Sequence, residues 1–346
     1  MDLARVLVVN AGSSSLKLSL LGDESDEPLA ERELDTGGAT IDRDWLREAL
    51  GGGLGAADVV AHRIVHGGPR FRDAVLVDQD VRAALDELTA LAPLHQPKSL
   101  AALDAVTEAL PELPAVACFD TAFHATLPDA AATFALPVKW RERWQLRRYG
   151  FHGLSHAYIA RYVAATVGDA RRIVSCHLGA GASLCAIADG CSVDTTMGFT
   201  PLDGLVMATR SGSVDPGLVL WLLEQTRMTE PEMAAALEHE SGLLGLAGTA
   251  DMREILERRA RGDARATLAI AVYLHRLRGG IASMAAALGG VDVIVFTAGV
   301  GEHAAEIRDE VVAGLGFLAD APRVLTVHAR EDLEIARQAR ALLTGG

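Results

Sequence analysis

Apolar residues along this chain follow two patterns, short dense runs and longer stretches with helical spacing. Short runs bounded by turn residues are typical of strands, whereas apolar residues three or four positions apart are typical of amphipathic helices. The runs predict strands within 4–21 (two strands around a tight turn) and at 28–34, 58–66, 114–119, 172–177, 182–188, 191–195, 291–297 and 324–327. The helical spacing predicts helices at 42–50, 79–92, 97–110, 155–167, 215–224, 230–238, 253–261, 264–288, 302–315 and 330–343.

This order of elements repeats once along the 346 residues. Each half opens with a strand meander that contains a turn of small residues, and each half then alternates helices and strands. Such a pattern predicts two α/β domains of similar topology. We expect the first domain over 1–150, the second over 151–331, and a crossing between them near 147–153. The last helix, 332–346, is expected to pack back on the first domain.

Composition and charge exclude several classes of function. Half of the residues are apolar, and 32 Lys and Arg against 46 Asp and Glu give a net charge of −14. A chain this acidic does not bind nucleic acid or an anionic membrane through its general field. Neither a signal-peptide core nor a run of membrane-spanning length is evident, so we expect a cytoplasmic protein. The four cysteines lack metal-site spacing and are interpreted as reduced thiols, three of them buried.

Three turns of small residues suggest sites for an anion. They are AGSSSLK at 11–17, HLGAGAS at 177–183 and TAGVGEH at 297–303. Small side chains let the backbone approach a ligand, and backbone N–H groups can surround a phosphate. A single turn of this kind is explained as well by a hairpin that needs glycine. Three of them in two matching halves favour a nucleotide bound by both domains.

Two arginines stand out among the charged residues. Arg63 and Arg210 are expected in loops next to Gly or Ser, without an acidic residue within two positions. In an acidic protein such arginines suit a carboxylate or phosphoryl ligand, although solvated surface arginines are the alternative. Four histidines, namely His62, His66, His124 and His156, are interpreted as structural hydrogen-bonding groups. His152 and His156 have the spacing of a helical metal site but lack a third ligand, so zinc is not favoured.

Taken together, these segments resemble the acetate kinase family, within the superfamily of acetate and sugar kinases, heat-shock ATPases and actin. The resemblance rests on NAGSSSLK, HRIVHGG, APLHQP, FDTAFH, RYGFHGLSH, HLGAGAS, DTTMGFTPLDGL, TRSGSVDP, DMR, FTAGVGEH and REDLEIAR, which follow in order from residue 10 to 337. It implies two duplicated actin-like (ribonuclease H-like) domains with an active-site cleft between them, and usually a homodimer. The implied reaction converts ATP and acetate to ADP and acetyl phosphate with Mg²⁺, or Mn²⁺ as an alternative.

The resemblance also implies a role for individual residues. The expected catalytic residues are Asp120, His152 and Arg210. Acetate would be bound by Arg63 and by an apolar pocket of Val65, Leu94, Phe151 and Pro201. The expected nucleotide-binding residues are Lys17, His177, Leu178, Gly179, Ala180, Gly181, Asp251, Met252, Arg253, Gly299, Val300, Gly301, Glu302 and His303. Asn10 and Glu331 would serve the metal, directly or through water.

The chain departs from the family pattern at three points. It is shorter than the family usually is, and the stretch 37–57 is the expected place of the loss. Ala180 and His303 stand where the family usually has Asn, so both departures affect nucleotide-holding turns. Two alternatives therefore remain beside acetate kinase. One is a kinase for propionate or another short-chain acid, because a single methylene changes binding by only about 1–3 kcal/mol. The other is a nucleotide-binding sensor without catalysis.

Overall fold

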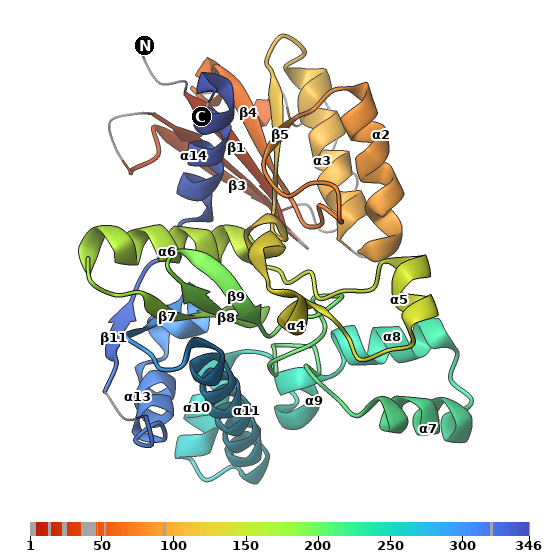
Figure 1. Ribbon diagram of the computed structural model, residues 1–346, viewed down its shortest axis with the longest axis vertical. Helices are drawn as coiled ribbons and strands as arrows, with labels where there is room; N and C mark the ends of the chain where they lie inside the picture. Colours follow the sequence, from red (N-terminus) through yellow and green to blue (C-terminus); the bar gives the residue numbers. More distant parts are fainter. Residues whose placement is uncertain are drawn as a thin grey trace. The chain divides into compact units, whose positions relative to one another are not determined.

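The computed structural model describes residues 5–12, 15–22, 26–35, 46, 48–51, 53–92, 95–318 and 321–345. The chain forms two units, which are shown in Figure 1. Unit 1 comprises Met1–Ala125, Phe151–Tyr158 and Arg330–Gly346, and unit 2 comprises Thr126–Gly150 and Ile159–Ala329. This division differs from the expected boundary at residue 150, because 126–150 group with unit 2 and 151–158 with unit 1.

Unit 1 is built on a six-stranded sheet with the order β3-β2-β1-β4-β6-β5. Its strands are β1 (Val6–Ala11), β2 (Ser15–Leu21), β3 (Ala30–Asp35), β4 (Val59–Ile64), β5 (Val75–Leu76) and β6 (Ala115–Phe119). Its helices are α2 (Gln79–Glu87), α3 (Gln96–Ala109), α14 (Glu331–Thr344) and the first part of α6 (Gly153–Thr166). Three 3₁₀ turns complete the region, at Leu54–Ala56, Leu88–Leu91 and Ala122–Thr126.

The alternation of side chains along β1 explains how the helices cover this sheet. Leu7 and Val9 belong to one core cluster with residues of α3, whereas Val6 and Val8 belong to another with residues of α14. Successive strand residues point to opposite faces, so an entirely apolar strand is buried on both sides. Figure 1 shows α14 on one face of the sheet and α2 and α3 on the other.

Unit 2 is built on a five-stranded sheet with the order β11-β10-β7-β8-β9. Its strands are β7 (Arg172–Leu178), β8 (Ala182–Ala188), β9 (Cys191–Thr195), β10 (Val293–Thr297) and β11 (Arg323–Thr326). Its helices are the rest of α6 with α4 (Asp129–Ala132), α5 (Val138–Trp144), α7 (Pro216–Thr226), α8 (Glu230–His239), α9 (Gly242–Ala247), α10 (Met252–Ala260), α11 (Ala264–Leu288), α12 (Ala298–His303) and α13 (Ala305–Ala313).

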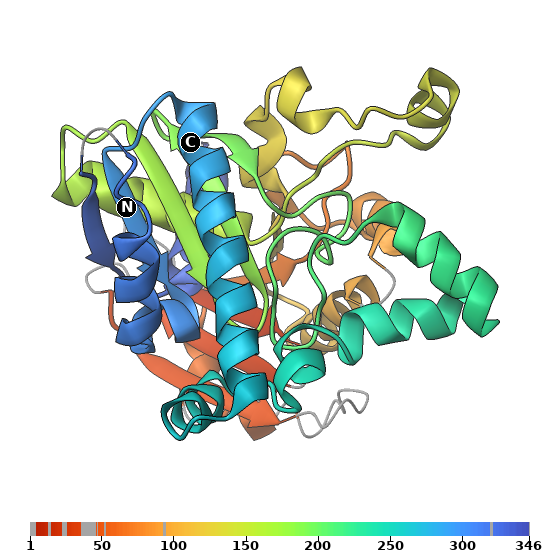
Figure 2. The same cartoon turned by 90° about the horizontal axis from the view of Figure 1, so that it is seen from below.

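The long helix α11 begins and ends at clear sequence signals. Asp263 caps its first turn by accepting hydrogen bonds from the N–H groups of Arg265 and Ala266, and Gly289 ends it with a positive φ of 65°. An acidic N-cap and a C-terminal glycine are the usual boundaries of a helix. The helix contacts β8 and β9 of the sheet and also the helices α9 and α10, and these neighbours account for its buried side chains. Figure 2 shows α11 lengthwise, with α7 and α8 side by side in the same unit.

The two sheets share one topology. In unit 1, β1 pairs antiparallel with β2, β2 pairs antiparallel with β3, and β4 and β6 continue the other side in parallel. In unit 2, β7, β8 and β9 form the same antiparallel meander, and β10 and β11 the same parallel extension. The prediction of two α/β domains with similar topology is therefore confirmed.

Most predicted elements are present, and the differences are local. The expected helix 302–315 is interrupted at Ala304, which separates α12 from α13. The short elements β5, α4, α5 and α9 were not predicted, because each has seven residues or fewer and a weak periodic signal. The expected helix at 42–50 lies largely outside the described residues. Among the described helices, none has the length and apolar character needed to cross a membrane.

One buried histidine makes the stability of unit 1 sensitive to pH. His62 lies on β4 with 1% exposure, and neither ring nitrogen has a hydrogen-bond partner among the described residues. Burial disfavours the charged ring and lowers the pKa of His62 to about 4, below its ordinary value of 6.5. The unfolded chain therefore binds a proton between pH 6.5 and 4 that the folded chain does not, so stability falls as the pH falls through this range.

We predict that His62→Leu weakens this pH dependence. Leucine suits the site because Val60 and Ile64, on the same face of β4, are buried in apolar clusters. Urea unfolding at pH 7.5 and 5.5 should show the variant losing less stability than the wild type, by about 1.4 kcal/mol for each pH unit below 6.5. His239→Leu is the control, because it removes a histidine that is exposed in the folded protein. An equal loss in wild type and His62→Leu would contradict this account.

Candidate functional site

A polar cluster of unit 1 lies where three parallel strands end. Asn10 is near the end of β1, Arg63 near the end of β4, and Asp120 directly follows β6. β1 pairs with β4 and β4 with β6 in parallel, so their carboxyl ends meet at one edge of the sheet. Ligands of open α/β sheets bind at this edge. The sheet thus brings together three residues that are far apart in sequence.

Arg63 is the centre of this cluster. Its Nε lies 3.1 Å from each carboxylate oxygen of Asp120, and its Nη2 donates to Asp120 Oδ2 at 2.7 Å. Its Nη1 donates to Asn10 Oδ1 at 3.1 Å and lies 3.9 Å from Glu331 Oε2, at the start of α14. Burial opposes the charge of Arg63, but Asp120 and Glu331 more than offset it and raise its pKa above the ordinary value. The arginine is therefore permanently charged and held on three sides.

The loop after β4 is fixed by a residue that the sequence analysis missed. Gln96, which is fully buried, accepts a hydrogen bond from His66 N through Oε1 and donates to His66 O through Nε2. The His66 ring in turn contacts Phe151 edge-on, with centroids 5.6 Å apart. Val65 and Phe151, two members of the expected apolar pocket, are both buried in unit 1. The signal for Gln96 was its position beside Pro97 at the start of an otherwise apolar helix.

The other expected pocket and nucleotide residues are distributed over both units. Leu94 lies outside the described residues. Pro201 is buried in unit 2. Lys17 belongs to unit 1, where it is opposite Asn10 in the β1–β2 pairing and lies 3.8 Å from Glu31 in an exposed ion pair.

Arg210 has an acidic partner that is distant in sequence. Its Nε lies 3.2 Å from Glu238 Oε2 at the end of α8, and its Nη1 donates to Pro201 O at 3.4 Å. Burial lowers the pKa of Arg210, and the contact with Glu238 opposes this shift. Two residues of the expected site, Arg210 and Pro201, are thus in contact. Neither Arg63 nor Arg210 has an acidic neighbour in the sequence, yet each is paired with a carboxylate in the structure. The partners, Asp120 and Glu238, come from other elements.

Two of the predicted phosphate turns meet in unit 2. The turn at 177–181 joins β7 to β8, and Gly179 N donates to Gly181 O at 3.0 Å. His177 pairs with Thr297, the residue immediately before α12, which contains 299–303. The loop of Arg210 joins the same region, because Ala208 N donates to Ala180 O at 3.1 Å. These contacts bring His177, Leu178, Ala180, Gly299, Val300 and Gly301 into one part of the unit.

Several expected nucleotide residues are already engaged within the protein. The Glu302 carboxylate accepts hydrogen bonds from Ala329 N at 2.9 Å and His328 Nδ1 at 2.6 Å. Burial opposes ionisation of Glu302, yet these hydrogen bonds lower its pKa. Asp251 caps α10 and pairs with the exposed Arg253 at 3.1 Å, while Met252 between them is buried. His303 is the last residue of α12 and is exposed. The helix α12 replaces the expected open turn.

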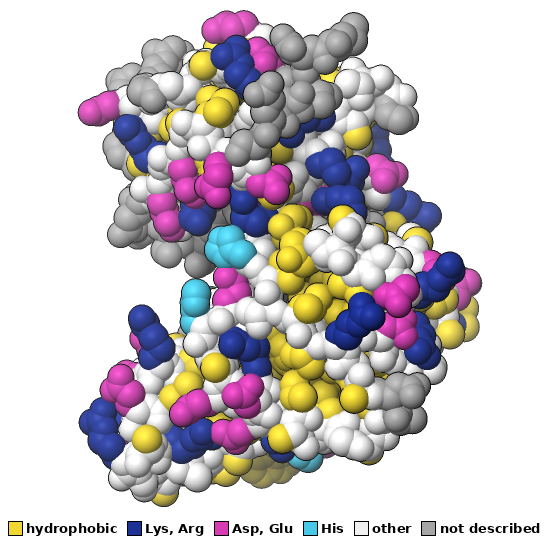
Figure 3. Space-filling view, turned by 90° about the vertical axis from the view of Figure 1, so that its left-hand side faces the viewer, with side chains coloured by type: hydrophobic (Ala, Val, Ile, Leu, Met, Phe, Trp, Pro, Cys, Tyr) yellow, Lys and Arg dark blue, Asp and Glu magenta, His cyan; other side chains and the backbone are white. Residues whose placement is uncertain are grey.

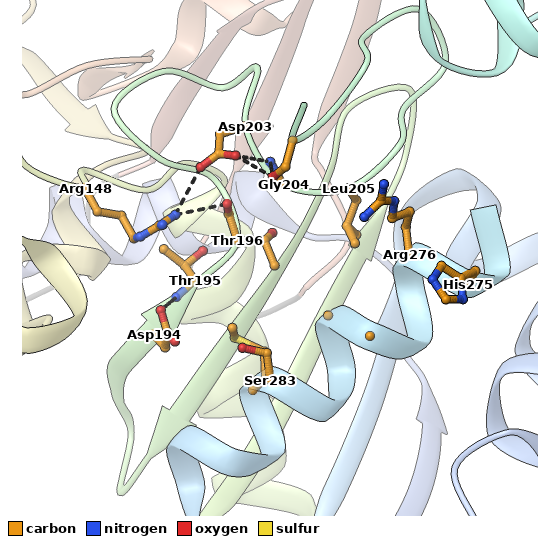
Figure 4. Close-up of a pocket in the computed structure, with 14 residues that line it drawn as sticks. Arg148, Asp194, Thr195, Thr196, Asp203, Gly204, Leu205, His275, Arg276 and Ser283 are labelled. Atoms are coloured by element: carbon orange, nitrogen blue, oxygen red, sulfur yellow. Dashed lines mark hydrogen bonds and ion pairs between the residues drawn. The ribbon is translucent and has the colours of Figure 1, made fainter. Parts of the chain in front are cut away.

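A pocket of about 320 Å³ in unit 2 contains none of the predicted site residues. Figure 4 shows Arg148 and Asp203 paired among the residues that line it, with Nη1 3.5 Å from Oδ2. Arg148 also donates to Thr196 O at 3.0 Å, and Asp203 accepts from Ser213 Oγ at 2.6 Å. Because these charged groups are satisfied within the protein, the pocket does not by itself indicate a ligand.

No group of three or more His, Cys, Asp or Glu side chains with metal-site geometry occurs among the described residues. The oxygen atoms around Arg63 are nevertheless the hard donors that Mg²⁺ prefers, namely one amide and two carboxylates. The formal charges of Arg63, Asp120 and Glu331 together give 1 − 2 = −1. Acidic side chains also lie among the basic ones on the face drawn in Figure 3. Binding a further anion beside Arg63 therefore needs additional positive charge.

Comparisons with known proteins show the family to which this chain belongs. Residues 44–336 match the model of the acetokinase family. An acetate kinase from Nostoc punctiforme is 40% identical, covering 98% of this chain and 99% of the relative. That alignment spans 403 positions, so this 346-residue chain lacks segments present in the relative.

Solved structures extend the similarity to the fold. A propionate kinase from Francisella tularensis has a TM-score of 0.90 at 33% identity, covering 97% of this chain and 98% of that chain. An acetate kinase from Porphyromonas gingivalis has a TM-score of 0.86 at 34% identity, covering 98% and 100%. The predicted fold class, two duplicated actin-like α/β domains, is confirmed by these neighbours. With a family model matched over most of its length and relatives at 40% identity, this chain belongs to the acetokinase family.

Proposed function

We propose that this protein is an acetate kinase, which reversibly transfers the γ-phosphoryl group of ATP to acetate and forms ADP and acetyl phosphate. The observation that carries the proposal is the position of Arg63. A charged guanidinium is held at the ligand-binding edge of the unit 1 sheet. The buried Val65 follows two residues later, and the buried Phe151 contacts the ring of the next residue, His66. A cation near small apolar side chains suits a short carboxylic acid. By resemblance to the family, Leu94 and Pro201 are further proposed acetate-binding residues.

The proposed reaction needs no general base. Carboxylic acids of this kind have pKa values near 4, so the nucleophile is already ionised at pH 7. One acetate oxygen attacks the γ-phosphorus while the bond to the β–γ bridging oxygen breaks, and ADP leaves with that oxygen. The barrier arises from bringing one anion to another, and positively charged groups lower it by stabilising charge on the transferred phosphoryl group.

We assign the remaining residues by the part of the substrates that each would contact. His152 and Arg210 stabilise the transferring phosphoryl group. The nucleotide is bound by Lys17 and by residues of unit 2 at 177–181, 251–253 and 299–303. The contact between the Arg210 loop and the turn at 177–181 supports this assignment, because it joins a phosphoryl-stabilising residue to a nucleotide turn.

The donor atoms around Arg63 fit a magnesium ion. Asn10 and Glu331 would hold it, directly or through water, and Mn²⁺ is the alternative with the same oxygen preference. When bound, the ion supplies positive charge to the phosphate oxygens. The net formal charge of −1 on the cluster supports this proposal, because Arg63 alone does not compensate Asp120 and Glu331.

Asp120 acts by positioning and not by accepting a proton. Its carboxylate is almost completely buried and makes three hydrogen-bonding contacts with Arg63. These contacts fix the plane and the position of the guanidinium, which is the usual benefit of a paired arginine–carboxylate contact. In this role Asp120 also contributes negative charge toward the metal.

A cytoplasmic homodimer completes the proposal. All four cysteines are free thiols, and three are buried. The helix α7 carries apolar residues throughout 218–223, yet none of its residues is buried, and Trp221 is 55% exposed. Exposed apolar surface of this kind marks protein–protein interfaces. A second copy of this chain is the partner that we propose for it.

We predict that the purified protein forms an acyl hydroxamate when ATP, Mg²⁺, acetate and hydroxylamine are present. Hydroxylamine traps the acyl phosphate, so the colour of the iron complex measures the reaction directly. Acetate should give the highest kcat/KM in a series with propionate and butyrate. Reactions without ATP or with added EDTA should give no product.

Other outcomes of this assay identify the alternatives. A higher kcat/KM for propionate or butyrate would make the protein a kinase for a longer acid. If the protein binds ATP but forms no product with any of the three acids, a nucleotide-binding sensor would be favoured.

We predict that Arg63→Lys raises the KM for acetate by about 10- to 100-fold, because lysine keeps the charge but lacks the planar fork that holds two oxygen atoms. Initial rates over a range of acetate concentrations provide the measurement. Arg82→Lys is the matched control, since Arg82 makes a similar paired contact with Asp104 elsewhere in unit 1. An unchanged KM in Arg63→Lys would remove Arg63 from the acetate site.

We predict that Asp120→Asn lowers kcat by about 100-fold or more and raises the Mg²⁺ concentration needed for half-maximal rate. Asparagine has the same shape but lacks the charge that orients Arg63 and attracts the metal. Magnesium titrations of the two proteins at saturating ATP test both effects. Near-normal turnover and an unchanged magnesium requirement would refute the assigned role, and Asp104→Asn should leave both parameters unaffected.

A further inference from the structure

The segment around His152 has an unusual backbone conformation. Gly150 and His152 both have positive φ angles, 71° and 56°, and His152 is one of few non-glycine residues described with this conformation. A side chain with a Cβ atom is strained in this left-handed region, so surrounding contacts must hold it there. The contacts of Phe151 and Gly153, on either side of His152, are therefore informative.

His124 holds the peptide that precedes His152. Its Nε2 lies 3.0 Å from Phe151 O, and because a carbonyl oxygen only accepts, the ring nitrogen donates. Phe151 O and His152 N belong to the same planar peptide group. Fixing the carbonyl oxygen thus fixes the orientation of the plane from which the φ angle of His152 is measured. A rotation of this plane would change φ at His152 and redirect its side chain.

The peptide that follows His152 is also fixed. Gly153 N donates to Asp120 O at 2.8 Å, and a Cβ atom at Gly153 would lie only 2.2 Å from that oxygen. The segment therefore lies directly against the turn that begins at Asp120. His152 O also accepts a hydrogen bond from His156 N at 3.0 Å, which starts α6. Of these flanking contacts, only the one from His124 comes from a side chain.

His124 is itself well placed to act as a rigid support. It is 1% exposed and packs edge-on between the rings of Phe123 and His156, at centroid distances of 5.8 and 5.7 Å. It lies on the 3₁₀ turn Ala122–Thr126, four residues after Asp120. Residues 120–124 thus carry both the Asp120 carboxylate and the His124 side chain, which fixes the peptide before His152.

We propose that His124 is a positioning residue, whose hydrogen bond to Phe151 O holds His152 in the conformation that directs its side chain at the transferring phosphoryl group. The inference rests on the proposed function, in which His152 touches that group. His124 acts through His152 and does not contact the substrate. It therefore affects the alignment of the phosphoryl group more than the binding of acetate or ATP.

The experiment compares two substitutions at His124 in wild-type and His152→Ala backgrounds. His124→Leu removes the donor, whereas His124→Gln keeps an amide donor at about the position of Nε2. His62→Leu is the matched control, because it removes another buried histidine of unit 1 that has no described hydrogen bond. Hydroxamate assays give kcat and KM for each protein, and urea unfolding identifies variants that are folded.

We expect His124→Leu to lower kcat by about 10- to 100-fold with little change in KM, as a small misalignment of a catalytic group does. His124→Gln should recover most of this loss, and His62→Leu should retain the wild-type kcat. In the His152→Ala background the effect of His124→Leu should shrink to less than about twofold, because residues that act through one another are not additive.

Other results would overturn the inference. A folded His124→Leu protein with wild-type kcat, or one with an equal loss in both backgrounds, would show that His124 does not act through His152. If His124→Leu does not fold, His124→Gln is compared with His124→Asn, whose shorter side chain moves the amide donor away from Phe151 O. Equal kcat values for these two variants would contradict the proposal. Failure of the proposed function is distinguished at once, since the wild type would then form no hydroxamate.

Discussion

The ion pair between Arg63 and Asp120 is the constraint around which the site of unit 1 is arranged. The guanidinium is partly buried and the carboxylate is almost completely buried, and each is unfavourable there unless it is paired and hydrogen bonded. The sheet supplies this pairing, because β4 and β6 are adjacent parallel strands that end beside each other. Asn10 and Glu331 then complete the surroundings of the arginine from β1 and α14. Loss of the sheet register would separate all four groups.

The repeated topology explains why the two units carry comparable features. The turn between β1 and β2 corresponds to the turn between β7 and β8, and each is closed by a short backbone hydrogen bond, Gly12 N to Ser15 O and Gly179 N to Gly181 O. Arg210, like Arg63, is paired with a carboxylate from a different element. The units nevertheless differ at these sites. The Arg63 pair lies beside sheet strands, whereas the Arg210 pair joins a loop to the end of α8.

Sequence patterns predicted the elements more completely than the contacts. Strands such as β1 and β7 are dense apolar runs bounded by turn residues, and this pattern is sufficient to predict a strand. The partners of individual side chains depend on tertiary structure, so Glu238 could not be identified from the residues near Arg210 in the sequence. The same limit applies to Glu302, which lies in a phosphate-turn motif but binds His328 and Ala329 through its carboxylate. Short elements such as α5 also lacked the periodicity that makes longer helices predictable.

The overall charge of −14 does not conflict with a site for two anionic substrates. Exposed charges more than about 10 Å from a ligand are largely screened at physiological ionic strength, whereas buried groups at contact distance are not. The local balance is decisive, and Arg63 with its two carboxylate neighbours gives −1 before any ligand binds. Since Arg63 cannot be deprotonated under ordinary conditions, this balance does not change by titration of the arginine. Additional positive charge is therefore a physical requirement of the proposed reaction, and this requirement explains why the proposal includes a metal ion as well as Arg63.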